Sequence, residues 1–126
     1  MPGSRVLLVD DETIFTKNMS KLLKFRGYEV AAVNSGDAAI RELEQNPVDV
    51  IVLDLKMPGM DGIATLKEII KLGLFAETLI LTGHGSIDSA LEAMKLGAYD
   101  YLTKPCEIDE LVAKIEAAWA KKKEAN

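Results

Sequence analysis

The sequence predicts an α/β protein in which five short strands alternate with five helices and form one parallel sheet, covered by helices on both faces. Two observations carry this prediction. Short apolar runs recur along the chain, and the segments between them repeat apolar residues at helical spacing. Runs such as VIVL at 50–53 are apolar at every position, which is typical of parallel strands that are buried on both faces. Each strand–helix–strand crossover is expected to be right-handed.

The strands are expected where the short apolar runs occur. In chain order they are Arg5–Val9, Tyr28–Val33, Asp49–Leu53, Thr78–Leu81 and Tyr99–Leu102.

The intervals between the strands carry helical periodicity. After the first strand, apolar residues follow the spacing i, i+4, i+7 and i+8, beginning at Phe15. The same kind of apolar stripe begins at Ile87 in the fourth interval and at Ile108 after the last strand.

Glycine and proline mark where several helices end. A glycine lies just past the first, third and fourth helical segments, where a left-handed cap is wanted: Gly27, Gly73 and Gly97. Pro47 ends the second helix because proline cannot donate the next helical hydrogen bond.

Length and charge limit the function classes. A chain of 126 residues predicts one domain, over residues 1–126 with its core at about residues 5–120, and we expect no effector domain in it. The net charge of −5 makes the protein a poor ligand for DNA or for anionic membranes, so neither partner is expected. The lysine run at 121–123 is interpreted as a solvated helix end.

Targeting and redox signals are absent from the sequence. Cys106 is the only cysteine, so no internal disulfide can form, which fits a reducing compartment. No segment approaches the about 18 apolar residues of a membrane span, and no signal peptide is recognisable. These features predict a cytoplasmic location.

The stretch VLLVDDE, residues 6–12, shows where the chemistry lies. An apolar strand runs directly into the carboxylates Asp10, Asp11 and Glu12, which repel one another and lose hydration if they are buried. In an open parallel sheet, ligands bind beyond the carboxyl ends of the strands. The polar residues at those ends, which we expect to converge at one edge, are Asp10, Asp11, Asp54, Thr82 and Lys104.

This set of side chains indicates a magnesium site and phosphoryl transfer. Carboxylate oxygens without histidine or cysteine nearby favour a hard divalent cation such as Mg²⁺. Lys104 would suit a phosphoryl oxygen or Asp54, Thr82 would suit another phosphoryl oxygen, and Asp54 would be a carboxylate nucleophile. The alternative is that these residues are ordinary polar caps of the loops, which fits each one alone better than all five together.

Four motifs resemble the receiver domain of bacterial response regulators. They are VLLVDDE, IVLDLKMPGMDG (51–62), LILTGHG (79–85) and GAYDYLTKP (97–105). They stand in the family's order and spacing, and the resemblance covers about residues 6–118. It implies a flavodoxin-like fold with the strand order 2-1-3-4-5. The segment AMKLGAYDYLTKP is most similar to receivers attached to enhancer-binding transcriptional regulators.

The resemblance also implies a role for each residue at the sheet edge. Asp54 would be the phosphoacceptor. Mg²⁺ would be bound by Asp11, Asp54 and the backbone carbonyl of Lys56, with Asp10 assisting directly or through water. Thr82 and Lys104 would stabilise the acyl phosphate.

Three further residues have implied roles. Tyr101 would change rotamer together with Thr82 when the protein is phosphorylated. Lys56 and His84, two residues after Asp54 and Thr82 respectively, would tune the lifetime of the phosphorylated state. The Lys104–Pro105 bond is expected to be cis.

The function implied by the resemblance is a phosphorylation switch in a two-component pathway or phosphorelay. The phosphoryl donor would be a histidine kinase or a histidine phosphotransfer protein. Phosphorylation would change the surface formed by the fourth helix, the fifth strand and the fifth helix, and the resemblance leaves room for a phosphorylation-dependent homodimer. The protein would catalyse only its own phosphorylation and dephosphorylation, and its effector is not identifiable.

Other function classes fit the sequence less well. A receiver used only as a scaffold should lack a member of the polar cluster, and none is missing. An aspartate-nucleophile phosphatase needs an acid two residues after the nucleophile, where this sequence has Lys56. A flavodoxin-like ligand-binding module would leave the carboxylates unexplained.

Overall fold

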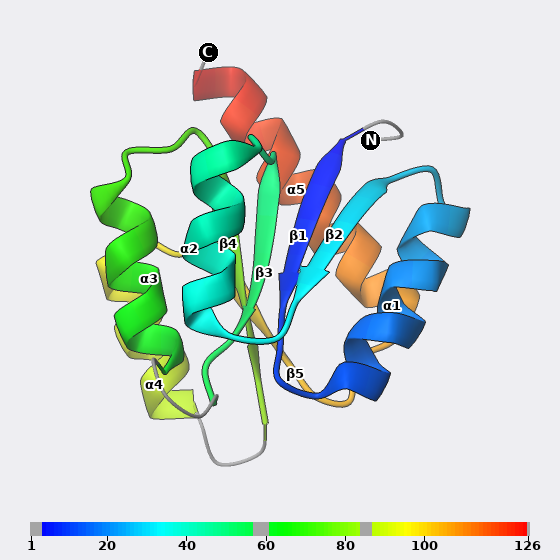
Figure 1. Cartoon of the computed structure of the whole chain (residues 1–126), viewed down its shortest axis with the longest axis horizontal. Coiled ribbons are helices and arrows are strands. Elements are labelled where there is room, and N and C mark those ends of the chain that lie inside the picture. Colours follow the sequence, from blue (N-terminus) through cyan, green and yellow to red (C-terminus); the bar gives the residue numbers. More distant parts are fainter. Residues whose placement is uncertain (1–3, 57–60, 84–86, 126) are drawn as a thin grey trace.

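The computed structural model describes residues 4–56, 61–83 and 87–125, and these residues form five strands that alternate with five helices (Figure 1). The elements in chain order are β1 (Arg5–Val9), α1 (Thr13–Phe25), β2 (Glu29–Val33), α2 (Gly36–Gln45), β3 (Val50–Asp54), α3 (Gly62–Lys71), β4 (Glu77–Thr82), α4 (Ile87–Leu96), β5 (Asp100–Thr103) and α5 (Ile108–Ala125).

All five strands belong to one parallel sheet with the order β2-β1-β3-β4-β5. This is the flavodoxin-like arrangement, and the predicted fold class and strand order are confirmed. The order reverses between β1 and β3, so the carboxyl ends of these two central strands lie side by side at the switch point.

Helices cover both faces of the sheet (Figure 1). Side chains alternate between the faces along a strand, so neighbouring residues of β1 enter different cores. Val6 and Leu8 pack with α1 and α5, whereas Leu7 and Val9 pack with α2, α3 and α4. Both faces of the sheet are therefore buried under helices, which explains why the strands are apolar at consecutive positions.

Three strands extend one residue further toward their carboxyl ends than the sequence predicted. Asp54, Thr82 and Thr103 are the last residues of β3, β4 and β5. Sheet pairing uses main-chain groups, so a polar side chain does not end a strand. The pairing even continues beyond β5, where the Lys104 N–H donates to the Thr82 carbonyl at 2.6 Å.

The strand starts also differ by one residue. β2 begins at Glu29, since the Tyr28 N–H donates to the Leu23 carbonyl at the end of α1. β3 and β5 begin one residue later than predicted and β4 begins one residue earlier.

The three predicted glycine caps have positive φ angles. Gly27 has φ 96°, Gly73 has φ 65° and Gly97 has φ 124°. The prediction of left-handed caps is therefore confirmed, and α2 ends at Gln45, just before Pro47.

The last turns of α5 are fixed to the amino edge of the sheet. Lys122 forms an ion pair with Asp49, and its side chain is only 17% exposed. Lys121 Nζ lies 3.6 Å from a carboxylate oxygen of Glu77 at the start of β4. The interpretation of this lysine run as a solvated helix end therefore holds for Lys121, whose side chain is 58% exposed, but is wrong for Lys122. In the part of the chain that the structure describes, no helix combines the length and apolarity needed to cross a membrane.

A comparison of Gly97 with Gly73 tests the cap geometry. A Cβ atom has room at both positions, so only the φ angle distinguishes them. Asparagine tolerates the left-handed region near φ 65°, but φ 124° lies outside it. We expect Gly97→Asn to lower the free energy of unfolding by roughly 1–3 kcal/mol. Gly73→Asn should cost less than about 1 kcal/mol in the same urea titration. Equal costs would contradict this explanation.

Candidate functional site

The carboxyl edge of the sheet brings together the acidic residues predicted from the sequence. One carboxylate oxygen each of Asp10, Asp11 and Asp54 lies within 4.8 Å of the others. Asp10 and Asp54 are 2% and 4% exposed, whereas Asp11 is exposed. Two buried carboxylates beside a third make this edge strongly negative.

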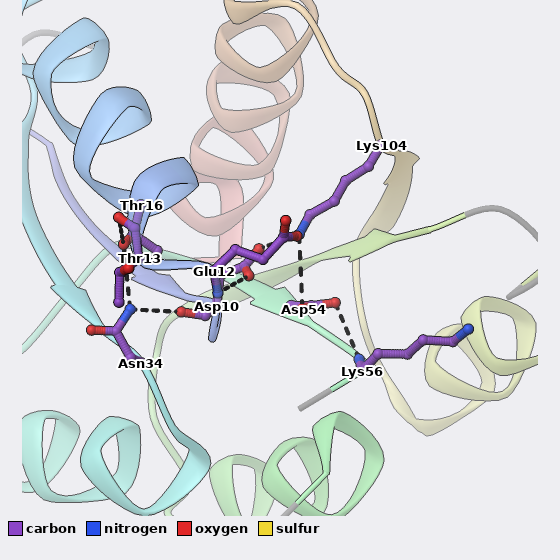
Figure 2. A network of polar contacts seen from close by, with 8 residues as sticks. All are labelled: Asp10, Glu12, Thr13, Thr16, Asn34, Asp54, Lys56 and Lys104. Carbon is purple, nitrogen blue, oxygen red and sulfur yellow. Dashed lines mark hydrogen bonds and ion pairs between the residues drawn. The ribbon is translucent and has the colours of Figure 1, made fainter. Parts of the chain in front are cut away.

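Lys104 supplies the positive charge that faces this cluster (Figure 2). Its Nζ lies 2.6 Å from Asp10 Oδ2 and 3.8 Å from Asp54 Oδ2, and it also contacts Glu12. The ammonium lies 4.7 Å from the centre of the Phe15 ring. Burial alone would lower the pKa of Lys104, but its hydrogen bonds with Asp10 and Glu12 outweigh burial and raise the pKa, so Lys104 stays charged.

Main-chain groups fix the orientation of both buried carboxylates. The Lys56 N–H donates to Asp54 Oδ1 at 3.1 Å, and the Glu12 N–H donates to Asp10 Oδ1 at 2.9 Å. In each case the donor is two residues beyond the aspartate, so the turn that follows the strand holds the side chain. The Lys56 side chain extends away from Asp54 in Figure 2, and only its backbone contacts the site.

The pKa of Asp54 reflects its burial and its neighbours. Burial raises this pKa to about 6, and the charges of Asp10 and Asp11 act in the same direction. The Lys56 N–H and the Lys104 ammonium oppose this rise without cancelling it. One ammonium is therefore too little positive charge for the acids that face it.

The donor set fits a hard divalent cation. The cluster offers only carboxylate oxygens, and among the described residues no histidine or cysteine joins it. Mg²⁺ takes one or two carboxylates and fills its other positions with water or phosphate oxygens. Asp10 already uses both oxygens, for the Glu12 N–H and for Lys104. Asp11 and Asp54 are thus better placed as direct ligands, and Asp10 would act through water.

Thr82 and Tyr101 lie on the face of the sheet opposite to that of Asp54. Asp54 pairs with Leu81, so Thr82 extends one position further along β4. Tyr101 pairs with Ile80, which faces α2, α3 and α4. Because side chains alternate along a strand, Thr82 and Tyr101 lie on the same face as Ile80. The Thr82 hydroxyl is buried and has no hydrogen-bond partner among the described residues. A buried unpaired hydroxyl at the edge of the site is free to donate to a ligand oxygen.

Two supporting residues escaped the sequence analysis. Asn34, directly after β2, donates to the Asp10 carbonyl at 2.8 Å and to the Thr16 hydroxyl at 3.3 Å, and so ties β2 to the site and to α1 (Figure 2). Asn34 follows a predicted strand. The search for polar residues at the carboxyl ends of strands, which selected Asp10 and Thr82, could therefore have selected Asn34 as well.

The second supporting residue is Gly62, the first residue of α3. A Cβ atom at Gly62 would lie 2.2 Å from Leu55 Cα and 2.6 Å from the Asp54 carbonyl oxygen, which no side chain allows. Its N–H donates to the Leu55 carbonyl at 3.0 Å. The absence of a side chain therefore lets α3 begin directly against the backbone of the phosphoacceptor candidate. No sequence pattern predicted this requirement, which comes from a close backbone contact and not from a positive φ angle at the end of a helix.

The structure brings together four of the charged residues that the sequence predicted for the site, and it also describes the predicted cis bond. The Lys104–Pro105 bond is cis, as expected. His84 lies outside the described residues. Asp10, Asp11, Asp54 and Lys104 are brought together.

Comparison with known proteins adds independent findings. The sequence profile of the response regulator receiver domain matches residues 6–116. The transcriptional regulatory protein ZraR of Escherichia coli strain K12 is 43% identical over 115 residues, which cover 91% of this chain and 26% of ZraR. The C4-dicarboxylate transport transcriptional regulatory protein DctD of Rhizobium meliloti is 34% identical over 118 residues, covering 94% of this chain and 26% of DctD. The chain thus spans about a quarter of the length of these curated relatives.

Solved structures give the same result. A response regulator receiver domain protein from Clostridium thermocellum superposes with a TM-score of 0.93 at 37% identity, covering 98% of this chain and 99% of that one. NtrX from Brucella abortus, in complex with ADP, superposes with a TM-score of 0.93 at 30% identity, covering 98% of this chain and 28% of NtrX.

The raised pKa of Asp54 predicts a stability change when its charge is removed. The folded protein holds the Asp54 proton up to a pH of about 6, whereas the ordinary carboxyl pKa is 3.8. The ionised carboxylate therefore destabilises the fold at neutral pH, and the free energy of unfolding falls as the pH rises between these two values. With a chelator at pH 7, we expect Asp54→Asn to raise the free energy of unfolding by roughly 1–3 kcal/mol.

The gain should shrink as the pH approaches 4, measured by urea unfolding followed by circular dichroism. Glu44→Gln removes an exposed carboxylate on α2 and serves as the control, with little expected change at either pH. A less stable Asp54→Asn protein at pH 7 would contradict the charge argument.

Proposed function

The chain belongs to the receiver domain family of two-component response regulators, and from this premise we propose that it accepts a phosphoryl group on Asp54, with Mg²⁺, from a histidine kinase or a histidine phosphotransfer protein. The observation that carries the proposal is the environment of Asp54. A buried carboxylate at the end of β3 faces Lys104 at 3.8 Å and shares its surroundings with two further acids.

Asp54 is suited to be the nucleophile because its two oxygens differ. Oδ1 accepts the Lys56 N–H, while Oδ2 faces Lys104 at 3.8 Å. In the transfer, an Asp54 oxygen forms a bond to phosphorus as the bond between phosphorus and the donor breaks. The donor atom leaves with the electron pair of the broken bond. Phosphoryl transfer needs little more from a protein than positioning and charge stabilisation.

The other residues of the site would supply that stabilisation. Asp11, Asp54 and the Lys56 carbonyl would hold Mg²⁺, with Asp10 assisting, and the bound ion would supply positive charge for the phosphoryl oxygens. The Lys104 ammonium would bind one phosphoryl oxygen. The Thr82 hydroxyl, which is buried and has no partner in the described part of the chain, would donate to another phosphoryl oxygen.

The signal would leave the site through Thr82 and Tyr101. Both lie on the face of the sheet that α2, α3 and α4 cover, and they stand on neighbouring strands. Movement of Thr82 toward a phosphoryl group would open space that the half-buried Tyr101 ring can enter. The surface formed by α4, β5 and α5 would then differ between two states separated by only a few kcal/mol.

The output is proposed from the relatives. ZraR and DctD are named as transcriptional regulatory proteins and are about four times as long as the matched segment. A transcription-regulating effector controlled by this receiver is therefore the proposed downstream partner. The phosphatase alternative gains no support, since Lys56 stands where a general acid is needed and its side chain extends away from Asp54.

A small phosphodonor tests the phosphoacceptor. Acetyl phosphate with Mg²⁺ should add one phosphoryl group, detected by intact-protein mass spectrometry and removed by hydroxylamine, as an acyl phosphate is. Asp54→Asn should abolish the label, because an amide oxygen is a poor nucleophile. Asp37→Asn changes an exposed aspartate at the start of α2 and should label like the wild type. Stoichiometric labelling of Asp54→Asn would refute the assignment.

A magnesium titration tests the proposed ligands. Asp11→Asn should weaken Mg²⁺ binding roughly tenfold or more, because it removes a charged ligand. Amide chemical shifts of residues 9–12 and 53–56, followed by NMR, report the binding. Asp37→Asn again serves as the control, and unchanged affinity in Asp11→Asn would contradict the site.

A further inference from the structure

Glu12 occupies the N-cap position of α1 without capping the helix. N-cap side chains usually accept a hydrogen bond from a backbone N–H of the first turn. Ser35 does so for α2, from Ala38 N at 3.1 Å, and Asp61 does so for α3, from Ala64 N at 2.8 Å. The Glu12 side chain accepts no such bond. Its carboxylate is therefore used elsewhere.

The Glu12 carboxylate contacts the ammonium of Lys104 (Figure 2). The same ammonium lies 2.6 Å from Asp10 Oδ2 but 3.8 Å from Asp54 Oδ2. Lys104 is thus held toward the start of α1, and Asp54 is the most distant of its three acidic neighbours. The Phe15 ring, also on α1, lies 4.7 Å from the ammonium and favours the same position.

The two close partners of Lys104 differ in what they lose if the ammonium moves. The Asp10 side chain is 2% exposed, so without the ammonium it would be a buried charge with little compensation. The Glu12 side chain is 61% exposed, and water can replace the ammonium there. The contact with Glu12 is therefore the one that Lys104 can give up at small cost.

We propose that Glu12 is a positioning residue that holds Lys104 away from Asp54 in the unphosphorylated protein and releases it when a phosphoryl group arrives at Asp54. This inference rests on the proposed function. As the bond from phosphorus to Asp54 forms and the donor leaves, the ammonium exchanges the Glu12 carboxylate for a phosphoryl oxygen, keeps its proton, and Glu12 becomes hydrated. Each phosphorylation must break the contact, so Glu12 slows phosphoryl capture by about two- to fivefold, the range of an exposed ion pair.

A simpler effect of Glu12 would be repulsion of an anionic donor, and two substitutions separate the explanations. Glu12→Gln removes both the charge and the ion pair. Glu12→Asp keeps the charge, but its side chain is one methylene shorter and cannot reach Lys104 in the same way. An aspartate at this position can also cap α1. Glutamine is a poor cap, so an effect that Glu12→Asp and Glu12→Gln share does not come from capping. Such an effect comes from the lost contact with Lys104.

The first measurement concerns the contact itself and needs no phosphorylation. NMR of the lysine side-chain ammonium and ε-methylene groups, with a chelator present, should show the Lys104 signals shifted in both variants. Lys114, which pairs with Asp100 on β5, provides the internal reference and should not change. Lys104 signals that stay at their wild-type positions in both variants would overturn the proposal.

The second measurement concerns phosphoryl capture. Rates of labelling by acetyl phosphate at saturating Mg²⁺ are measured over a range of donor concentrations. Both Glu12 variants should show a two- to fivefold higher maximal rate and an unchanged half-saturating donor concentration, while Glu44→Gln behaves like the wild type. A lower half-saturating concentration in Glu12→Gln alone, with Glu12→Asp like the wild type, would show repulsion of the donor and overturn the proposal.

Failure of the proposed function has a different signature. If neither the wild type nor any Glu12 variant were labelled, phosphorylation of Asp54 would be refuted, and the release step with it. Labelling of the wild type with identical kinetics in both variants would refute the role of Glu12 alone.

Discussion

The burial of two carboxylates beside a single ammonium is the constraint on which this structure depends. Asp10 and Asp54 are almost completely removed from water, and Lys104 is the cation that both of them face. Main-chain N–H groups stabilise one oxygen of each acid, but the balance stays negative, and the pKa of Asp54 rises to about 6. A site of this kind is destabilised when it is empty and gains from any added positive charge. The same imbalance supports the proposed binding of a divalent cation, whose charge would in turn offset that of a phosphoryl group.

The alternation of side chains along the strands divides the site into two parts. Asp10, Asp54 and Lys104 continue the face of the sheet that α1 and α5 cover, whereas Thr82 and Tyr101 continue the face that α2, α3 and α4 cover. The charges are therefore gathered on one side, and the two residues proposed to move are on the other. A ligand at the edge of the sheet can contact both, because the edge is the place where the two faces meet. Gly62 lets α3 begin against the backbone of Asp54 and Leu55, since a Cβ atom at this position would collide with both.

The opposite edge of the sheet has a different character. There Lys121 and Lys122 pair with acids at the starts of β4 and β3, and the end of α5 is fixed to the sheet. Each of these ion pairs joins one cation to one acid, in contrast to the acids that crowd around Lys104. These two pairs at the amino edge are thus balanced in charge, whereas the acids around Lys104 at the carboxyl edge outnumber it. The pairing of charges therefore differs between the edge proposed to bind ligands and the edge to which α5 is fixed.

The sequence by itself determined the fold class, the order of the elements and most of the acidic cluster. Apolar runs and helical spacing report burial directly, and polar residues at or just beyond the carboxyl ends of these runs mark one edge of the sheet, so Asp10, Asp54, Thr82 and Lys104 could be found before any coordinates. The strand order came from the resemblance of four motifs to a known family, because pairing between distant strands leaves no local pattern. Only the tertiary structure decided which side chains share a face and which partner each charge has. The contact between Glu12 and Lys104 joins residues 92 positions apart, and the need for glycine at position 62 arises from the backbone of Leu55. Both depend on distances between segments that the chain brings together only when the sheet has formed, and no spacing along the sequence encodes such a distance.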